Sequence, residues 1–349
     1  MEINISQEKW QILVPLDFAH SYENQISYAV LLAYRFEAEL LLFHVLLENE
    51  VDKSVINGAK KGGGDLIEAA LANLEKIIDL LPKDIVSTKI INVSKSPSRG
   101  ILETALSYGI DMVVCGVANI SHRFLPNALS TVLNVMQQSR FPVVLVTSES
   151  WSSLQSKVIR IMIVDDLSEA CESNVKLAMT WCSRVKDCEV YHVHVHAMER
   201  ESFISNDFAS PLSDGMLNSY EYDPGEAYDQ QHSRLKLRLK ARLDSLNIEK
   251  PNHLKRFQSI LLTGSVANQV FEYARSVDAD ILFFGKHHAF DRLHPVLGKI
   301  SYRAMLQERF PVIITPMDWV AKLKSEPRAN EDMNKRLQGQ NQSANGMSR

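Results

Sequence analysis

The sequence has few cysteines, no long apolar run and no excess of basic residues. Its 349 residues include four cysteines without a CxxC pair or the spacing of a disulfide framework, which favours a reduced, cytosolic set of thiols. No apolar run approaches the ~20 residues that a membrane helix needs, and the opening MEINISQEKW lacks a basic segment followed by an apolar one. We therefore expect a cytoplasmic protein without membrane insertion.

Charge and catalytic motifs are also sparse. The formal net charge of −4 argues against a strongly basic face, so we expect no nucleic-acid partner. The sequence contains neither a GxSxG elbow nor a GxxxxGK[ST] phosphate loop. The adjacent carboxylates Asp165 and Asp166 diverge if they lie on a strand. No set of catalytic residues is predicted, and we do not expect an enzyme.

An internal repeat is the strongest positive signal. RFPVV begins at Arg140 and RFPVI begins at Arg309, a separation of 169 residues (from 140 to 309). The same separation relates Gly116, in VVCG, to Gly285, in LFFG. A shared separation over such a stretch predicts two copies of one domain.

The beginnings of the copies match at a shorter separation. Asp17 in QILVPLD corresponds to Asp166 in RIMIVDD, 149 residues later (from 17 to 166). The second copy therefore carries additional residues, which we place in a Ser/Asp/Pro/Gly-rich loop at 198–227. The predicted domains are 8–149 and 157–318, followed by a polar, Gln/Asn-rich tail at 325–349 that we expect to be disordered.

Each copy alternates short apolar strands with amphipathic helices. The strands are expected at 12–16, 39–46, 88–93, 111–115 and 142–147, and again at 161–164, 189–196, 257–262, 280–284 and 311–315. The helices are expected at 22–36, 66–81, 97–108 and 128–139, and again at 170–184, 230–246, 266–277 and 297–308. This alternation predicts an α/β fold with parallel strands. Apolar runs such as MVVC and ILFF are typical of strands covered on both faces.

Five strands in this order, with Asp after the first and Gly after the fourth, resemble the universal stress protein family over both copies. The resemblance implies two doubly wound five-stranded parallel sheets of order 3-2-1-4-5 in tandem, flavodoxin-like and adenine-nucleotide-hydrolase-like. Many members bind ATP at the C-terminal edge of strands one and four. The strand order reverses there, so topology also predicts a crevice.

The family's phosphate pattern runs Gly, two residues, Gly, nine residues, Gly, then Ser or Thr. Glycines let the backbone N–H groups approach the phosphates, and the following helix N-terminus adds positive potential. The positions in the first copy are Gly116, Asn119, Leu129 and Ser130. Those in the second copy are Gly285, His288, Gly298 and Lys299, with a hydroxyl two residues later at Ser301. The second copy keeps two glycines and is the better candidate.

Several candidate residues have two interpretations. Lys299 could pair with a phosphate or could be a solvated residue that opens the last helix. The resemblance implies that Asp17 and Asp166 hold the ribose or adenine end of a nucleotide, whereas a helix-capping role is equally open. Asp165 adds negative charge, or could hold Mg²⁺ together with phosphate oxygens.

The candidate cofactor is ATP, ADP or AMP with Mg²⁺. Val45 and Val195, in the second strand of each copy, complete the candidate nucleotide-binding set.

Three histidines alternate along one predicted strand of the second copy. His192, His194 and His196 share one face but extend over ~13 Å, too far for all three to meet one ion. His44 occupies the place of His194 in the first copy, so a structural role is the favoured interpretation.

Three functional hypotheses remain. The first is a stress-response regulator that binds an adenine nucleotide mainly in the second copy, shifts the loop at 198–227 and is read by a regulatory protein. The second is a nucleotide-independent scaffold with degenerate sites, and the third is a slow ATP hydrolase. The duplication also predicts that strands 142–147 and 311–315 pair within the chain as a pseudo-dimer, which would act as a monomer or form a homodimer.

Overall fold

The computed structural model describes residues 9–18, 22–51, 63–117, 127–147, 158–185, 187–197, 224–286 and 310–319. The chain divides into two compact units. The first comprises Met1–Cys115, Asn127–Phe141 and Ala321–Arg349, and the second comprises Gly116–Pro126 and Pro142–Val320. The domain limits 8–149 and 157–318 stay a prediction. The predicted tail and residues 198–223 of the predicted loop lie outside the described residues.

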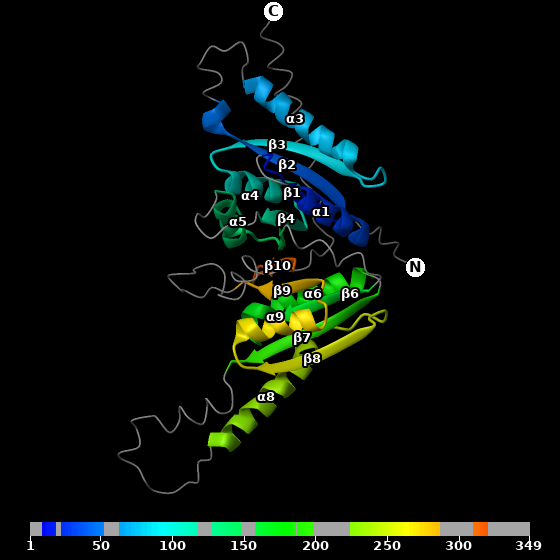
Figure 1. Ribbon diagram of the computed structural model, residues 1–349, viewed down its shortest axis with the longest axis vertical. Coiled ribbons are helices and arrows are strands. Elements are labelled where there is room, and N and C mark those ends of the chain that lie inside the picture. The colour runs from blue at the N-terminus through cyan, green and yellow to red at the C-terminus, as the bar shows by residue number, and fades with distance from the viewer. Residues whose placement is uncertain are drawn as a thin grey trace, which may run out of the picture. The chain divides into compact units, whose positions relative to one another are not determined.

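The described part of the first half contains five strands in the order β3-β2-β1-β4-β5 (Figure 1). The strands are β1 (Gln11–Pro15), β2 (Glu39–Leu47), β3 (Ser87–Ser94), β4 (Met112–Val117) and β5 (Val143–Thr147). The helices are α1 (Glu23–Phe36), α3 (Gly63–Leu80), α4 (Pro97–Tyr108) and α5 (Asn127–Gln138). Strand β1 pairs in parallel with β2 and with β4, and β2 pairs in parallel with β3.

The second half repeats this order as β8-β7-β6-β9-β10. The strands are β6 (Ile159–Val164), β7 (Cys188–His196), β8 (Arg256–Thr263), β9 (Ile281–Gly285) and β10 (Val312–Thr315). The helices are the short 3₁₀ helix η1 (Glu169–Cys171), α6 (Glu172–Arg184), α8 (Pro224–Ser245) and α9 (Val266–Ser276). The predicted α/β fold with strand order 3-2-1-4-5 in each copy is confirmed. The predicted helix at 297–308 lies outside the described part of the chain.

Helix α8 begins earlier than the sequence pattern predicts. It starts at Pro224 and not at 230, so residues 224–227 are helical and do not belong to a loop. Proline is well suited to the first turn of a helix, because the N–H group that it lacks has no partner within the helix there.

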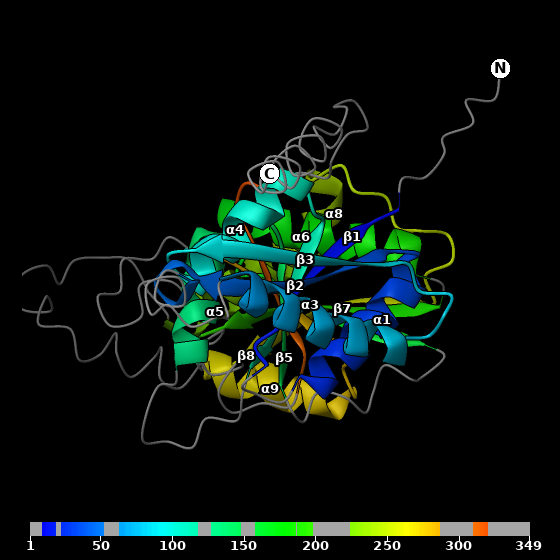
Figure 2. The same ribbon diagram turned by 90° about the horizontal axis from the view of Figure 1, so that it is seen from above.

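The helices cover both faces of the strands in each unit. Figure 2 shows α4 on one side of β2 and β3, with α1 and α3 on the other. In the second unit, α9 lies on one side of β7 and β8, and α6 and α8 lie on the other. Right-handed crossovers require this distribution, because the direction of winding reverses after the third strand.

An aspartate at the start of the fourth strand anchors the first strand in each copy. The backbone N–H of Gln11 donates to Asp111 Oδ2 at 2.7 Å. The backbone N–H of Arg160 donates to Asp280 Oδ2, also at 2.7 Å. The pair Asp111 and Asp280, which the repeat aligns, therefore has the same structural role in both copies.

A buried amide side chain from the first helix also joins the first and fourth strands in each copy. Gln25 Nε2 donates to the carbonyl oxygens of Pro15 on β1 and Val114 on β4, at 2.7 and 2.8 Å. Asn174 Nδ2 donates in the same way to β6 and β9, at 3.2 and 3.1 Å. In each copy the amide therefore connects the two parallel strands between which the strand order reverses.

Apolar strand residues make the core of each unit. Ile12, Leu13 and Leu40 are fully buried in the first unit. In the second unit the buried ring of Phe283 meets Trp181 edge to face, with centroids 5.2 Å apart. Full burial of such a side chain stabilises the fold by about 1.5–3 kcal/mol.

The last strands of the two copies pair with each other. Strand β5 belongs to the second compact unit and runs antiparallel to β10, with Ile313 opposite Val144. The predicted pairing of 142–147 with 311–315 is therefore present. It satisfies the backbone groups of two strands that would otherwise be exposed sheet edges.

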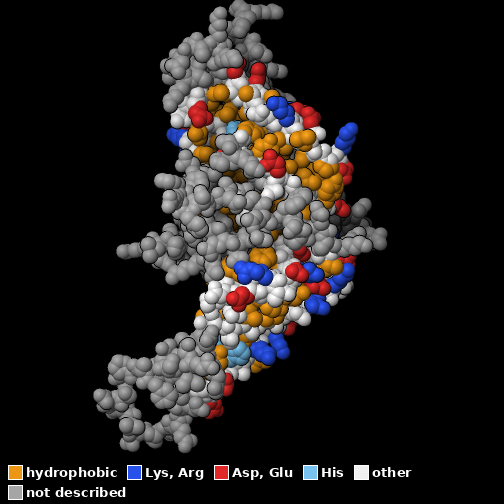
Figure 3. All heavy atoms as spheres, viewed as in Figure 1, with side chains coloured by type: hydrophobic (Ala, Val, Ile, Leu, Met, Phe, Trp, Pro, Cys, Tyr) orange, Lys and Arg blue, Asp and Glu red, His pale blue; other side chains and the backbone are white. Residues whose placement is uncertain are grey.

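The described surface carries charges of both signs. In the view of Figure 3, acidic and basic side chains are interspersed with apolar ones, as the small net charge leads one to expect. Among the described helices, none combines the length and the apolar character required to cross a bilayer.

Candidate functional site

The candidate site of the second copy lies at the C-terminal edge of β6 and β9. These parallel strands are neighbours, with Val164 opposite Phe284. Asp165 and Asp166 follow β6, and Lys286 follows β9. Because the strand order reverses between β6 and β9, this edge is the topological switch point of the sheet.

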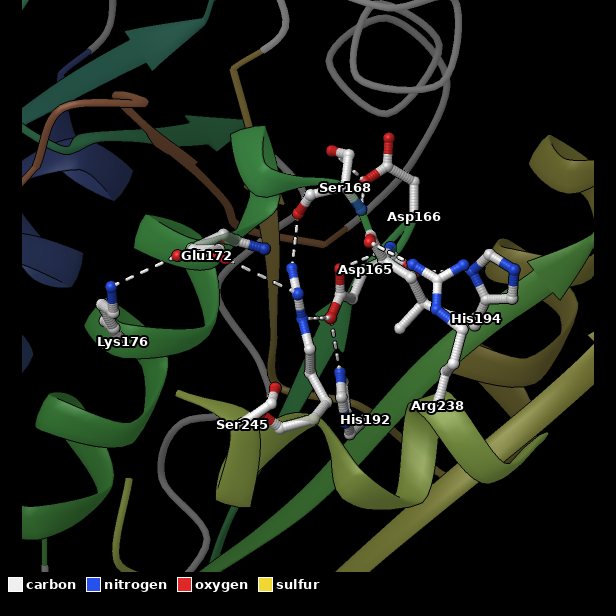
Figure 4. A network of polar contacts seen from close by, with 12 residues as sticks. Asp165, Asp166, Ser168, Glu172, Lys176, His192, His194, Arg238 and Ser245 are labelled. Atoms are coloured by element: carbon white, nitrogen blue, oxygen red, sulfur yellow. Dashed lines mark hydrogen bonds and ion pairs between the residues drawn. The ribbon is translucent and has the colours of Figure 1, made fainter. Parts of the chain in front are cut away.

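Asp165 is the centre of a buried polar network (Figure 4). Its side chain is fully buried, and Oδ2 accepts hydrogen bonds from His192 Nε2 at 3.0 Å and from Arg242 Nε at 3.1 Å. Its Oδ1 accepts from the backbone N–H of Leu167 at 2.7 Å. A buried carboxylate is tolerated only with such compensation, since removing it from water costs several kcal/mol.

Helix α8 holds the turn formed by residues 165–168. Arg238 Nη2 donates to the carbonyl oxygen of Leu167 at 3.1 Å, and Arg242 Nη2 donates to the carbonyl oxygen of Ser168. Leu167 has a φ of 63°, in the left-handed region that residues other than glycine seldom adopt. The two guanidinium groups thus fix a turn whose backbone conformation is unfavourable by itself.

Asp166 is exposed at this turn. Its Oδ1 accepts from the backbone N–H and from the hydroxyl of Ser168, at 2.9 and 2.6 Å (Figure 4). A carboxylate that bonds to the N–H group two residues later stabilises a turn, here the one that leads into η1. Asp166 thus stabilises the turn and is not the predicted helix cap, because the N-cap of η1 is Ser168, which makes no side-chain capping bond. Ligand contact by Asp166 stays a prediction.

Gly285 at the end of β9 makes room for η1. A Cβ atom at Gly285 would lie 2.9 Å from Cys171 Sγ and 3.4 Å from Cys171 Cα. Burial raises the pKa of the Cys171 thiol, and the charge of Asp166 raises it further. Glycine at this position therefore has a packing reason that does not involve phosphate.

Substituting alanine for Gly285 tests this packing. The added methyl group would displace η1, and overpacking of this kind costs about 1–3 kcal/mol. Chemical denaturation of the Gly285→Ala variant should show that loss. Adding Cys171→Ala should recover part of the loss, because the sulfur atom is the nearest neighbour. Equal stability of Gly285→Ala and the parent chain would contradict the assigned packing role.

The three aligned histidines of β7 contact three different groups. His192 binds the Asp165 carboxylate, whereas His194 Nδ1 donates to the Asp165 carbonyl oxygen at 2.8 Å. His196 stacks on Tyr228, with ring centroids 5.0 Å apart, and lies near His232. Burial lowers the pKa of His196, and His232 and His194 lower it further. Each histidine therefore has its own structural contacts.

A comparison with protein families identifies the first copy. Residues 11–147 match the model of the Universal stress protein family. The first copy is therefore a universal stress protein domain. None of the curated proteins matches it significantly.

Solved structures share the fold of both halves. A universal stress protein from Archaeoglobus fulgidus DSM 4304 is 13% identical, with a TM-score of 0.58 over 88% of this chain and 96% of that one. A protein of unknown function from Pseudomonas aeruginosa PAO1 is 12% identical, with a TM-score of 0.55 over 89% and 93% of the two chains. At these identities the similarity establishes the fold alone.

The first copy presents an equivalent edge with different chemistry. Asp17 is exposed after β1, and Gly116 is partly exposed within β4. Val45 on β2 packs towards α4, where a Cβ at Gly100 would lie 2.9 Å from Val45 Cγ2. Val195, its counterpart on β7, is buried.

The remaining candidates belong to the predicted phosphate cradles. Ser130 lies within α5, close to its start. The following positions lie outside the described residues: Asn119, His288, Gly298, Lys299 and Ser301. Their predicted role as phosphate contacts stays a prediction.

Lys286 was missed by the sequence reasoning. It lies at the same edge as Asp166, and its pKa is lowered by burial, with Asp318 acting in the opposite direction. The available signal was a lysine directly after the apolar run ILFFG. A half-buried ammonium at a switch point is a natural partner for an anion.

The residues at this edge fit an adenine nucleotide in part. Asp166 offers an exposed carboxylate and Lys286 offers a cation, which suit a ribose and an anionic group. Asp165, Asp166 and Cys171 each place one potential metal-ligand atom within 4.8 Å of the others. However, Asp165 already binds Arg242 and His192, and a thiol is a poor ligand for Mg²⁺.

Proposed function

We propose that the chain is a tandem universal stress protein, a stress-response regulator that binds ATP, ADP or AMP in its second copy. The observation that carries the proposal is the presence of exposed Asp166 and half-buried Lys286 at the same edge, where the strand order reverses. A ribose hydroxyl can donate to the carboxylate, while a phosphate can pair with the ammonium.

The remaining nucleotide contacts are the candidates in and beside the family's phosphate pattern, together with one valine from the second strand of each copy. In the second copy they comprise Val195, Gly285, His288, Gly298, Lys299 and Ser301. The first copy contributes a weaker site comprising Asp17, Val45, Gly116, Asn119 and Ser130. Mg²⁺ would enter with the phosphates, which are its usual partners in nucleotide sites.

Thermal unfolding of the full chain tests the proposal. A ligand that binds only the native state at 100 times its Kd stabilises that state by about 2.7 kcal/mol. ATP, ADP or AMP with Mg²⁺ should therefore raise Tm by several degrees. Asp166→Ala should abolish the shift, and Asp17→Ala should leave most of it in place.

Two alternatives have distinct outcomes in the same experiment. Absence of any shift at millimolar nucleotide would overturn the proposal and favour a nucleotide-independent scaffold. Turnover of ATP that disappears in Asp166→Ala would indicate a slow hydrolase, for which the described residues supply no arranged general base. The proposal includes a regulatory protein, which binds the second copy when that copy holds a nucleotide.

A further inference from the structure

The buried network of the second copy occupies positions that carry apolar side chains in the first. His44 Nδ1 donates to the Leu16 carbonyl oxygen at 2.8 Å, and His194 Nδ1 donates to the Asp165 carbonyl oxygen at the same distance. Leu16 and Asp165 are therefore equivalent positions. The strand registers likewise make Leu42, opposite Val14, equivalent to His192, opposite Ile163.

Both leucines are buried, so apolar packing is sufficient to complete this position of the fold. Asp165 and His192 are buried as well, and the guanidinium group of Arg242 on α8 compensates the buried carboxylate. A buried ion pair seldom stabilises a fold more than apolar side chains of similar volume do. The charged residues of the second copy add something that apolar packing does not provide, namely hydrogen bonds of defined direction between the turn and α8.

That connection joins α8 to the turn that presents Asp166. Arg238 and Arg242 lie four residues apart, on one face of the helix. Together they bind the Asp165 carboxylate and the carbonyl oxygens of the next residues, Leu167 and Ser168. Any ligand that shifts or orders this turn must act on both guanidinium groups.

We propose that Arg238 and Arg242 are positioning residues that couple a ligand bound at Asp166 to helix α8, and that the first copy lacks this coupling. The inference rests on the proposed nucleotide site. It assigns the regulatory output of that site to α8, whose order and position report whether a nucleotide is bound. Coupling of this type typically changes affinity 5–150-fold.

Hydrogen–deuterium exchange of the full chain, with and without ATP and Mg²⁺, tests the coupling. Nucleotide should slow exchange in the turn at 165–168 and also in α8 around 236–244. The variant Asp165→Leu/His192→Leu/Arg242→Leu restores the apolar chemistry of the first copy without leaving an unpaired charge. It should fold, bind ATP roughly tenfold more weakly and lose the response of α8.

Two further variants separate positioning from general effects. Arg238→Met removes only the bond to the Leu167 carbonyl, and should weaken binding and the α8 response even if the triple variant does not fold. Arg234→Leu removes an exposed positive charge from the same helix and is the matched control, for which an unchanged affinity is expected. Arg242→Lys should give an intermediate affinity, because lysine retains the charge without the planar fork.

The outcomes distinguish this inference from the proposed function. If the parent chain shows neither a thermal shift nor altered exchange with nucleotide, the nucleotide site itself is wrong. If nucleotide protects the turn while α8 is unaffected, or if the triple variant and Arg238→Met bind ATP as tightly as the parent chain, the coupling is wrong and the nucleotide site stands.

Discussion

Replacing Arg242 by Leu should lower the free energy of unfolding by about 3–5 kcal/mol. The guanidinium group is mostly buried, and it lies 3.1 Å from a carboxylate that is fully buried. Removing it leaves the Asp165 charge without its strongest compensation in a region of low dielectric. Urea unfolding of the full chain at neutral pH, followed by circular dichroism, measures the loss.

The triple variant Asp165→Leu/His192→Leu/Arg242→Leu provides the control for that prediction. It replaces the three buried members of the network and places leucine where the first copy has Leu16 and Leu42. Glu172, which also lies 3.8 Å from Arg242, keeps its ion pair with Lys176. Most of the lost stability should return, since apolar replacement of a whole buried network is often neutral or stabilising. If the Arg242→Leu variant unfolds at the same urea concentration as the parent chain, the Asp165 carboxylate is not buried as described.

Asn174→Leu should lower the free energy of unfolding by about 3 kcal/mol. The side chain is fully buried and donates to carbonyl oxygens of β6 and β9, while its own Oδ1 accepts from Thr315 Oγ1 at 2.9 Å. Leucine leaves three buried polar groups without this partner, at a cost of about 1–3 kcal/mol for each group that finds no other. The same urea experiment measures the effect.

Two variants bracket the Asn174 prediction. Lys176→Leu changes an exposed residue of the same helix, whose ion pair with Glu172 is at the surface, and should alter stability by no more than ~0.5 kcal/mol. Gln25→Leu removes the equivalent amide of the first copy and should destabilise comparably. A small effect for both amide variants would mean that water replaces the lost donors.

Periodicity predicted most of the elements because their burial is regular. The apolar runs 111–115 and 280–284 became the buried strands β4 and β9, and the two copies share their order. The start of α8 was predicted too late. The sequence PGEAYD at 224–229 shows no apolar stripe, and its proline and glycine favoured a loop, although proline is well suited to the first turn of a helix.

The candidate site was predicted in position but not in detail. Asp166 was placed at a strand end by the repeat, and it lies there. The partner of its neighbour Asp165 is 77 residues away on a helix, and no local pattern relates the two. Gly285 was interpreted as a position where the backbone approaches a phosphate. The structure gives another reason for glycine, because a side chain there would collide with Cys171.

By itself, the sequence determined the duplication, the alternation of strands and helices, and the divergence of the two phosphate patterns. These features are encoded in spacing along the chain, because a strand or helix repeats its burial every two or about 3.6 residues. The tertiary structure alone decided that Asp165 is buried, that Arg238 and Arg242 hold its turn, and that Lys286 shares the edge with Asp166. Compensation of a buried charge depends on which side chains the fold brings within hydrogen-bonding distance, and that distance is unrelated to separation in sequence.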